Sequence, residues 1–208
     1  MNDSSILIES LKAQPHADWA ALSCELPKAS FICFQTDENI KLKSYLQMLA
    51  RIESVNSGKI SYLDNIKLGY LDETINLVSV LSGFNNLILA ANYHQLNSPE
   101  FILQQAEKLL VDFNCLAIKD NLPAFMSAFE QRLLLILRAL MLSPDILFIA
   151  KPFHGLDYCD YSRLHDCLVK LVTERNISLV CCDYESEFIE KNTNMMIHYQ
   201  QQTFKIMS

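Results

Sequence analysis

The sequence predicts an α/β domain with a mixed, largely parallel sheet and an inserted helical subdomain. Apolar segments rich in β-branched and aromatic residues alternate along the chain with segments of helical periodicity, the pattern typical of parallel strands covered by helices. A helix-rich middle, from about 74 to 138, interrupts that alternation. Seven segments are predicted to be strands: 30–35, 59–63, 67–71, 145–150, 177–182, 195–199 and 203–207.

Four helices follow from the spacing of apolar residues. The first starts near Glu38, and its apolar face comprises Leu42, Tyr45, Leu46, Leu49 and Ile52. The second begins at Ser98, a capping residue that precedes Pro99. The third, over about 128–142, is apolar almost all round and is therefore expected to be buried. The fourth covers about 158–174.

Composition limits the function classes. Half of the 208 residues are hydrophobic and a fifth are charged, as in a globular domain. The net charge of −7 argues against a nucleic-acid partner, because phosphate contacts need clustered Lys and Arg. The seven cysteines show no zinc spacing and are expected to be reduced thiols. The chain has no 18-residue apolar run and no signal-peptide pattern at its start, so no membrane span is expected.

The most informative stretch is residues 125–157, FMSAFEQRLLLILRALMLSPDILFIAKPFHGLD. It resembles the run in ABC-type ATPases in which a signature loop, LSGGQ, leads into a helix ending in RAL. In that family a strand ending in an acidic pair follows, and then a turn with the pattern PxxGLD. Here Ser127, Arg138-Ala139-Leu140, Pro144-Asp145, Pro152 and Gly155-Leu156-Asp157 stand at matching spacings.

The resemblance covers nearly the whole chain. Residues 22–29, LSCELPKA, are similar to the family's LSxxIPKG, and residues 57–60, SGKI, to its SGxI. It implies one P-loop-NTPase-like (ABC ATPase) domain over 1–208, with a core lobe of about 1–73 and 139–208 and a helical subdomain of about 74–138. Three short segments, 84–87, 98–100 and 152–153, look like the corresponding regions of bacterial lipid-trafficking ABC ATPases.

The family's phosphate loop, GxxxxGK[ST], is replaced. Counted back from SGKI, its lysine position falls on Leu42, and both glycines are absent. Asp37 and Glu38 place negative charge where a polyanion would lie, at a cost of about 4 kcal/mol per contact. The degenerate loop comprises Thr36, Asp37, Glu38, Leu42, Lys43 and Ser44. An acidic helix start that suits the helix dipole is the simpler interpretation.

The other catalytic positions implied by the resemblance are also replaced. The acidic pair that helps to hold Mg²⁺ and polarises the attacking water falls on Ala150 and Lys151. Ala150 offers no ligand, and Lys151 reverses the charge of the general base. The switch histidine falls on Cys182, and the glutamine at the head of the helical subdomain falls on Glu73.

The signature loop reads Ser127, Ala128, Phe129 and Glu130. Phe129 is expected to place a ring where a nucleotide must approach the backbone. Ser127 and Glu130 have the spacing of a capping box for the apolar helix that follows. The structural interpretation explains this segment without a nucleotide.

Two further groups of residues are candidates for a functional site. His154, Asp157 and His165 are candidates for a metal site or a triad, but surface histidines and a helix-capping Asp157 are the favoured interpretation. Cys181 and Cys182 are expected to be small buried hydrophobic residues of a core strand rather than a redox pair.

Together these replacements predict that the chain is no enzyme but a pseudo-ATPase, with no catalytic residues, no metal and neither ATP nor Mg²⁺ as cofactor. The resemblance implies a scaffold or regulator of a membrane transport complex, with lipid as one candidate substrate, at the inner face of the cytoplasmic membrane. Its expected partners are an integral-membrane permease and either an active ABC ATPase subunit or a second copy. Candidate docking residues beside the helical subdomain are Glu73, Phe84, Tyr93 and Phe101. The alternatives are a weakly ATP-binding, non-hydrolysing regulatory module and a soluble adaptor outside transport.

The capping interpretation gives a testable prediction. Ser127→Ala is expected to lower the free energy of unfolding by about 1 kcal/mol, because the first helical turn loses an acceptor for its N–H groups. Urea denaturation of the two proteins measures the difference. An unchanged free energy of unfolding would contradict the capping role.

Overall fold

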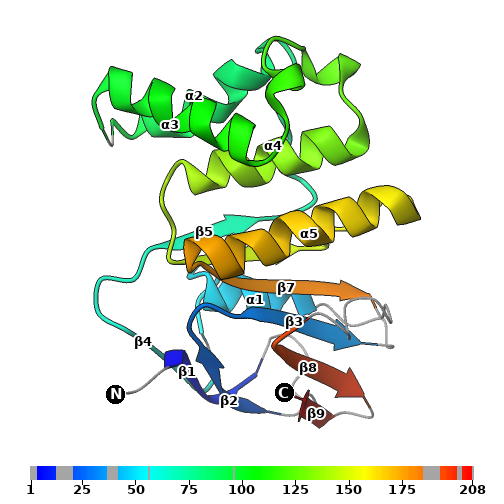
Figure 1. Cartoon of the computed structure of the whole chain (residues 1–208). Helices are drawn as coiled ribbons and strands as arrows, with labels where there is room; N and C mark the ends of the chain where they lie inside the picture. The colour runs from blue at the N-terminus through cyan, green and yellow to red at the C-terminus, as the bar shows by residue number, and fades with distance from the viewer. Residues whose placement is uncertain are drawn as a thin grey trace. The chain divides into compact units, whose positions relative to one another are not determined.

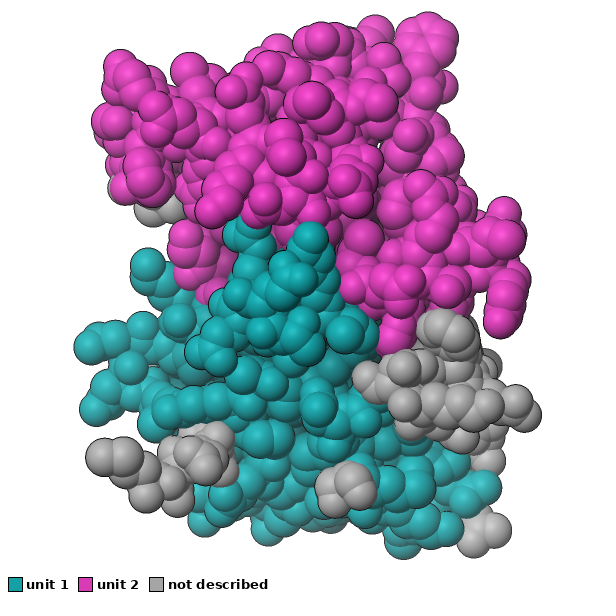
Figure 2. Space-filling model, viewed as in Figure 1, with its two compact units in different colours: residues 1–72, 145–152, 168–208 teal, residues 73–144, 153–167 magenta. Residues whose placement is uncertain are grey.

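The computed structural model describes residues 4–12, 21–36, 42–55, 57–95, 97–184, 193–200 and 203–207. The chain divides into two compact units, shown in different colours in Figure 2. The first consists of Met1–Asp72, Asp145–Pro152 and Leu168–Ser208, and the second of Glu73–Pro144 and Phe153–Cys167. The predicted single domain with a core lobe and a helical subdomain stays a prediction.

A six-stranded sheet forms the first unit's centre, in the order β5-β6-β7-β3-β8-β9 (Figure 1). The strands are β3 (Phe31–Thr36), β5 (Leu68–Leu71), β6 (Ile146–Ala150), β7 (Ser178–Tyr184), β8 (Met195–Gln200) and β9 (Thr203–Met207). The five strands β5, β6, β7, β3 and β8 run parallel to one another. In this sheet only β9 is antiparallel to its neighbour, β8. The mixed, largely parallel sheet of the predicted α/β class is therefore present.

A second, antiparallel sheet of three strands belongs to the same unit. Its order is β2 (Leu22–Pro27), β1 (Ser4–Leu11) and β4 (Lys59–Tyr62). The sequence analysis did not predict β1, although Ile6 and Ile8 are buried on one side of it. Three apolar residues in succession, at 6–8, hid the alternation that a half-buried strand normally shows.

Helix α1 (Leu42–Leu49) shares a hydrophobic core with both sheets. Its apolar residues lie in one cluster with Ile8 and Leu26 of the small sheet and with Phe34 and Phe148 of the large one. The expected buried face is correct except at its end. Ile52 lies beyond the helix and is exposed, because α1 stops at Leu49.

Helices make up most of the second unit. They are α2 (Gly83–Tyr93), α3 (Pro99–Asp112) and α4 (Ala128–Leu140), with short 3₁₀ turns η1 (Leu116–Ile118) and η2 (Pro123–Phe125). α2 packs against α3 and α4. The last helix, α5 (Tyr158–Arg175), begins among the residues of this unit. No helix among the described residues is long and apolar enough to cross a membrane.

The sequence analysis missed α2, which carries several asparagines that have low helix propensity. One of them is structural. Asn86 is fully buried, accepts a hydrogen bond from the Val78 N–H at 2.8 Å, and donates to the Leu81 carbonyl at 2.9 Å. The side chain therefore ties the segment before α2 to the helix.

The predicted cap at Ser98, at the start of α3, and the predicted burial of α4 are confirmed.

The position of His165 differs from the predicted one. It was expected at the surface, but on α5 it is only 2% exposed. His154 is exposed, as expected, and Asp157 accepts a hydrogen bond from the Asp160 N–H at 2.9 Å, which confirms its capping role. Burial lowers the pKa of His165, although Asp166, whose Oδ1 lies 3.8 Å from Nδ1, acts in the opposite direction. The three residues form no triad.

A first structural prediction concerns Gly83. A Cβ added there would lie 2.3 Å from the carbonyl oxygen of Ile118, which is backbone and has little freedom to move. Gly83→Ala is therefore expected to lower the free energy of unfolding by about 2–3 kcal/mol. Gly155→Ala is the control: its Cβ meets no atom within 4 Å, and only its positive φ opposes the change. Urea denaturation giving a smaller loss for Gly83→Ala than for Gly155→Ala would contradict the packing argument.

A second prediction concerns pH. The folded-state pKa of His165 is lowered below the unfolded value of about 6.5. The unfolded state therefore binds more protons, so the stability present above that pH is lost as the pH falls through and below it. His165→Gln is expected to flatten the decrease in unfolding free energy between about pH 7 and 5, measured by urea denaturation. His154→Gln, at an exposed position, should keep the wild-type slope; equal slopes in both variants would contradict the assignment.

Candidate functional site

The carboxyl ends of the parallel strands form the candidate site of the first unit. In open α/β sheets, ligands bind beyond these ends. Here Asp72 follows β5, Lys151 follows β6, Cys182 and Asp183 lie near the end of β7, and Thr36 ends β3. The residues predicted at the phosphate loop and at the acidic pair therefore lie along the same edge of one sheet.

The phosphate-loop residues separate into buried and half-buried positions. Thr36 and Leu42 are buried, and Leu42 belongs to the core cluster that α1 shares with the two sheets. Lys43 and Ser44 are half-buried in the first turn of α1. Asp37 and Glu38 lie outside the described residues. The leucine at the family's lysine position is thus a core residue, and the neighbouring lysine lies outside the core cluster.

Lys43 is engaged in an ion pair that the sequence analysis did not foresee. Its Nζ lies 3.0 Å from Oδ2 of Asp72, and the two side chains are 25% and 10% exposed. The Tyr70 hydroxyl donates to the same carboxylate oxygen at 3.4 Å. α1 contacts β6, β7 and β3, so the pair joins the start of this helix to the end of β5. Lys43 and Asp72 are 29 positions apart in the sequence, so no local signal indicated the pairing.

The structure brings Ala150, Lys151 and Cys182 together. Ala150 and Cys182 are register partners on β6 and β7, and both side chains lie in the core cluster. The Lys151 N–H donates to the Cys182 carbonyl at 2.7 Å. Lys151 has a φ of 51°, a left-handed conformation that costs a non-glycine residue roughly 1–2 kcal/mol. A hydrogen bond to the neighbouring strand holds this backbone at the end of β6.

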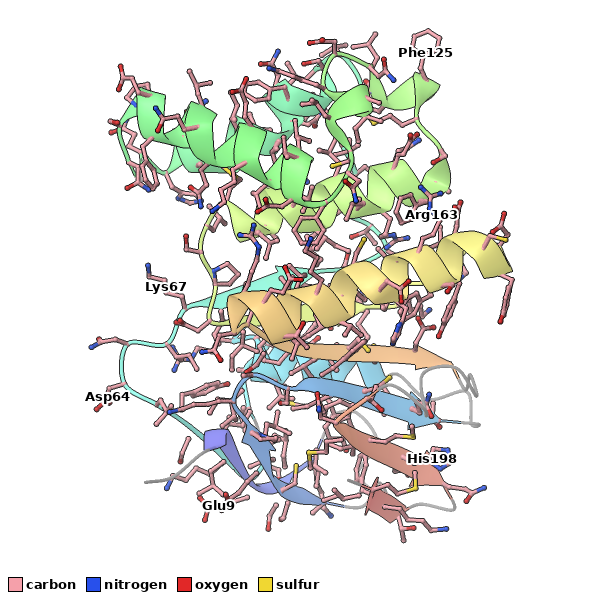
Figure 3. All side chains as sticks on the ribbon, viewed as in Figure 1. Glu9, Asp64, Lys67, Phe125, Arg163 and His198 are labelled. Atoms are coloured by element: carbon pink, nitrogen blue, oxygen red, sulfur yellow. The ribbon has the colours of Figure 1, made fainter. Side chains whose placement is uncertain are left out.

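In the second unit, the signature segment caps α4. The Glu130 N–H donates to Oγ of Ser127 at 3.2 Å, and the Ser127 N–H donates to the Glu130 carboxylate at 2.7 Å. This confirms the capping box. The ring of Phe129 is buried, and the guanidinium of Arg163, labelled in Figure 3, lies 4.0 Å from the ring centroid.

The sequence analysis also missed Gln131. Its Nε2 donates to the carbonyls of Pro123 and Met126 at 3.0 and 3.1 Å, which ties η2 to the start of α4. Phe125, in that same turn, is 77% exposed, and its ring points away from the ribbon in Figure 3. Neither residue carries a sequence signal that distinguishes it from its neighbours.

The four docking candidates belong to the second unit. Tyr93, at the end of α2, is 79% exposed, and Phe101, in the first turn of α3, is 51% exposed. Phe84 is half-buried, with Nζ of Lys119 4.8 Å from its ring centroid. Glu73 is half-buried too. Their role in docking stays a prediction.

Within the part of the chain that the structure describes, no group of three or more His, Cys, Asp or Glu side chains is arranged to hold a metal ion. The cysteines described here are free thiols. Cys181 and Cys182 are both buried on β7, as predicted, and burial raises the pKa of the Cys181 thiol well above its usual value.

Comparisons with known proteins identify relatives over part of the chain, although no family model matches it. The zinc import ATP-binding protein ZnuC of Buchnera aphidicola is 24% identical over 142 residues, which are 68% of this chain and 57% of that protein. The uncharacterized ABC transporter ATP-binding protein YthP of Bacillus subtilis is 29% identical over 64% of this chain and 56% of its own length. The lipopolysaccharide export ATP-binding protein LptB of Haemophilus influenzae is 26% identical over 56% and 48%. The matched segments thus span about half the length of these relatives.

Solved structures show the fold. An inward-facing metal-chelate-type ABC transporter contains a chain that matches 99% of this one with a TM-score of 0.88 at 18% identity, over 83% of that chain. CbiO1 of Clostridium perfringens matches 98% with a TM-score of 0.86 at 16% identity, over 88% of its chain. A dimeric ATP-binding cassette in a post-hydrolysis state, bound to ADP and Pi, matches 98% of both chains with a TM-score of 0.80 at 16% identity.

These comparisons contradict two predictions, that the chain is no ATPase and that ATP and Mg²⁺ are not its cofactors. The relatives are named as ATP-binding proteins, and one structure of the same fold holds ADP and Pi. Both predictions relied only on the replaced side chains of the phosphate loop and of the catalytic positions. Phosphate recognition at a helix N-terminus also uses backbone N–H groups, which a comparison of side chains does not include.

The recognition from sequence is confirmed. LptB agrees with the similarity to lipid-trafficking proteins, while other relatives are zinc import proteins. The chain is a relative of the ABC transporter ATP-binding proteins, and its fold is that of an ABC ATPase domain.

Proposed function

We propose that this chain is an ATP-binding subunit of a membrane transport complex. The observation that carries the proposal is its similarity to transporter ATP-binding proteins, with the ABC ATPase fold over 99% of the chain. In this proposal residues 1–208 form one domain, with a core lobe (about 1–73 and 139–208) and a helical subdomain (about 74–138). The subunit lies at the inner face of the membrane, bound to a permease and paired with a second ATPase subunit or a second copy. The relatives differ in substrate, so the transported substrate stays open.

The carboxyl edge of the first unit is the proposed nucleotide site. α1 follows β3 there, and the N–H groups at the start of a helix favour a phosphate. Two lysines, Lys43 and Lys151, are placed at this edge by α1 and by the end of β6. A bound Mg²⁺ would neutralise charge on the phosphate oxygens. Oxygen donors for it are present in the described residues at Asp72 and Asp183, while Ala150 offers none.

The second unit is the proposed docking partner of the permease. Tyr93 and Phe101 are large apolar side chains with most or half of their surface exposed. Exposed aromatic residues of this size supply much of the binding energy in protein interfaces. Phe84 and Glu73, both half-buried, are further docking candidates, whereas Leu87 and Ala91 of α2 are buried inside the unit.

Capture from membranes tests the subunit role. The tagged chain, incubated with detergent-solubilised membranes of its source cell, is expected to retain a protein with several membrane spans, identified by mass spectrometry. Tyr93→Ala/Phe101→Ala should reduce its recovery about tenfold or more, since two such aromatic residues each contribute on the order of 1–2 kcal/mol. Val111→Ala, at another exposed apolar position of α3, is the control.

Two results would contradict the proposal. Retention of soluble proteins alone would favour an adaptor outside transport. Equal retention of the membrane protein by the Tyr93→Ala/Phe101→Ala variant would remove the docking surface from the proposal while leaving the subunit role.

A further inference from the structure

We propose that Cys33, Cys181 and Met196 form a binding site for copper(I), a soft monovalent metal ion, inside the first unit. Two thiolates and one thioether hold the ion on one face of the six-stranded sheet. The inference does not depend on the proposed nucleotide site. It follows from the register, the burial and the chemistry of three sulfur side chains.

These side chains form a row, here called the sulfur row, across three adjacent strands. Cys33 of β3 is the register partner of Cys181 on β7 and of Met196 on β8. Register partners on neighbouring strands point to the same face of a sheet. Ile32 and Phe34, on either side of Cys33 in the sequence, pack in the core cluster with α1, so the sulfur row lies on the other face. Cys33 is therefore central, with a sulfur donor on each side.

The spacing of the strands suits a single ion. Neighbouring strands lie about 4.8 Å apart. Two thiolate sulfur atoms that are each about 2.3 Å from a metal ion lie at most about 4.6 Å apart. The Cys33 and Cys181 thiols are direct neighbours, since burial first and the Cys33 thiol second raise the pKa of Cys181 well above its usual value. Met196 has a long, flexible side chain that can bring its sulfur to the same ion.

The donor set favours copper(I) over zinc. Thiolate and thioether sulfur atoms are soft ligands that select copper(I). Structural zinc takes four ligands in a tetrahedron, and within the described part of the chain no three His, Cys, Asp or Glu side chains are arranged to hold a metal ion. Cys33 and Cys181 are 0% exposed and Met196 is 5% exposed, so water does not compete for the ion.

A buried amide next to the sulfur row supports the site. Each thiol releases its proton on binding the ion, so two thiolates and one copper(I) carry one negative charge. Gln35 lies two residues after Cys33 on β3, on the same face and about 6.6 Å along the strand. It is 1% exposed, and its Nε2 has no hydrogen-bond partner among the described residues. This N–H donor is available to the thiolates, as donors around a metal site commonly are.

Competition with bicinchoninate, a coloured copper(I) chelator, tests the site on the full chain under anaerobic, reducing conditions. The wild-type chain is expected to take one copper(I) from the chelator. Cys33→Ala and Cys181→Ala should each lose this ion, because each removes a thiolate. Met196→Leu should weaken binding about tenfold or more, since changes to the surroundings of a metal site alone alter affinity about 10–100-fold.

The chain offers matched controls. Cys182 is the next residue on β7 and is also buried, but it packs in the core cluster on the other face. Cys182→Ala should therefore keep the ion, as should Cys159→Ala, which removes an exposed thiol. If the variants at Cys33 or Cys181 fail to fold, Met196→Leu remains informative because it conserves volume. X-ray absorption at the copper edge should show three sulfur neighbours in the wild-type chain and two in Met196→Leu.

Three results would overturn the inference. A wild-type chain that takes no copper(I) from the chelator would exclude the site. Equal loss of copper(I) in Cys182→Ala and Cys181→Ala would mean that binding reports only an intact core. Three sulfur neighbours in Met196→Leu would remove the thioether from the site.

Discussion

Burial of one face of α1 is the constraint on which the first unit depends. Leu42, Tyr45, Leu46 and Leu49 lie in the core that the three-stranded and six-stranded sheets share. Fully burying a side chain of this size contributes roughly 1.5–3 kcal/mol, so the helix joins the two sheets through several such contributions. Edge-to-face contact of Tyr45 with Phe204, 5.2 Å between ring centroids, extends the core to β9.

That packing decides which residues remain for chemistry. Once one face of α1 is committed to the core, Lys43 is left at the carboxyl edge of the sheet, where its ammonium pairs with Asp72 at the end of β5. The same logic applies at the end of β6, where Ala150 packs inward and the backbone turns at Lys151. The candidate site is thus a consequence of how the core is filled, and its polar residues are those that the core excluded.

The sequence predicted the fold well because the relevant signals are local. Apolar runs of strand length, the helical spacing in α1 and the capping residues at Ser98 and Ser127 each depend on neighbours within a few positions. Where local signals were weak, the prediction failed. α2 contains asparagines that disfavour a helix, and only its contacts with α3 and α4, together with the buried hydrogen bonds of Asn86, compensate.

The candidate site was predicted only in part. Thr36, Ala150 and Lys151, which were read from a family pattern, lie at one edge of the sheet, but the partners of these residues could not be predicted. Lys43 pairs with a residue 29 positions away, Phe129 turns inward under Arg163, and His165 is buried, because each outcome depends on tertiary packing. The sequence by itself determined most of the strand and helix pattern, β1 and α2 excepted, and the kinship to ABC transporter ATP-binding proteins. Only the tertiary structure decided which charges meet, since chain segments distant in sequence compete for the same buried space.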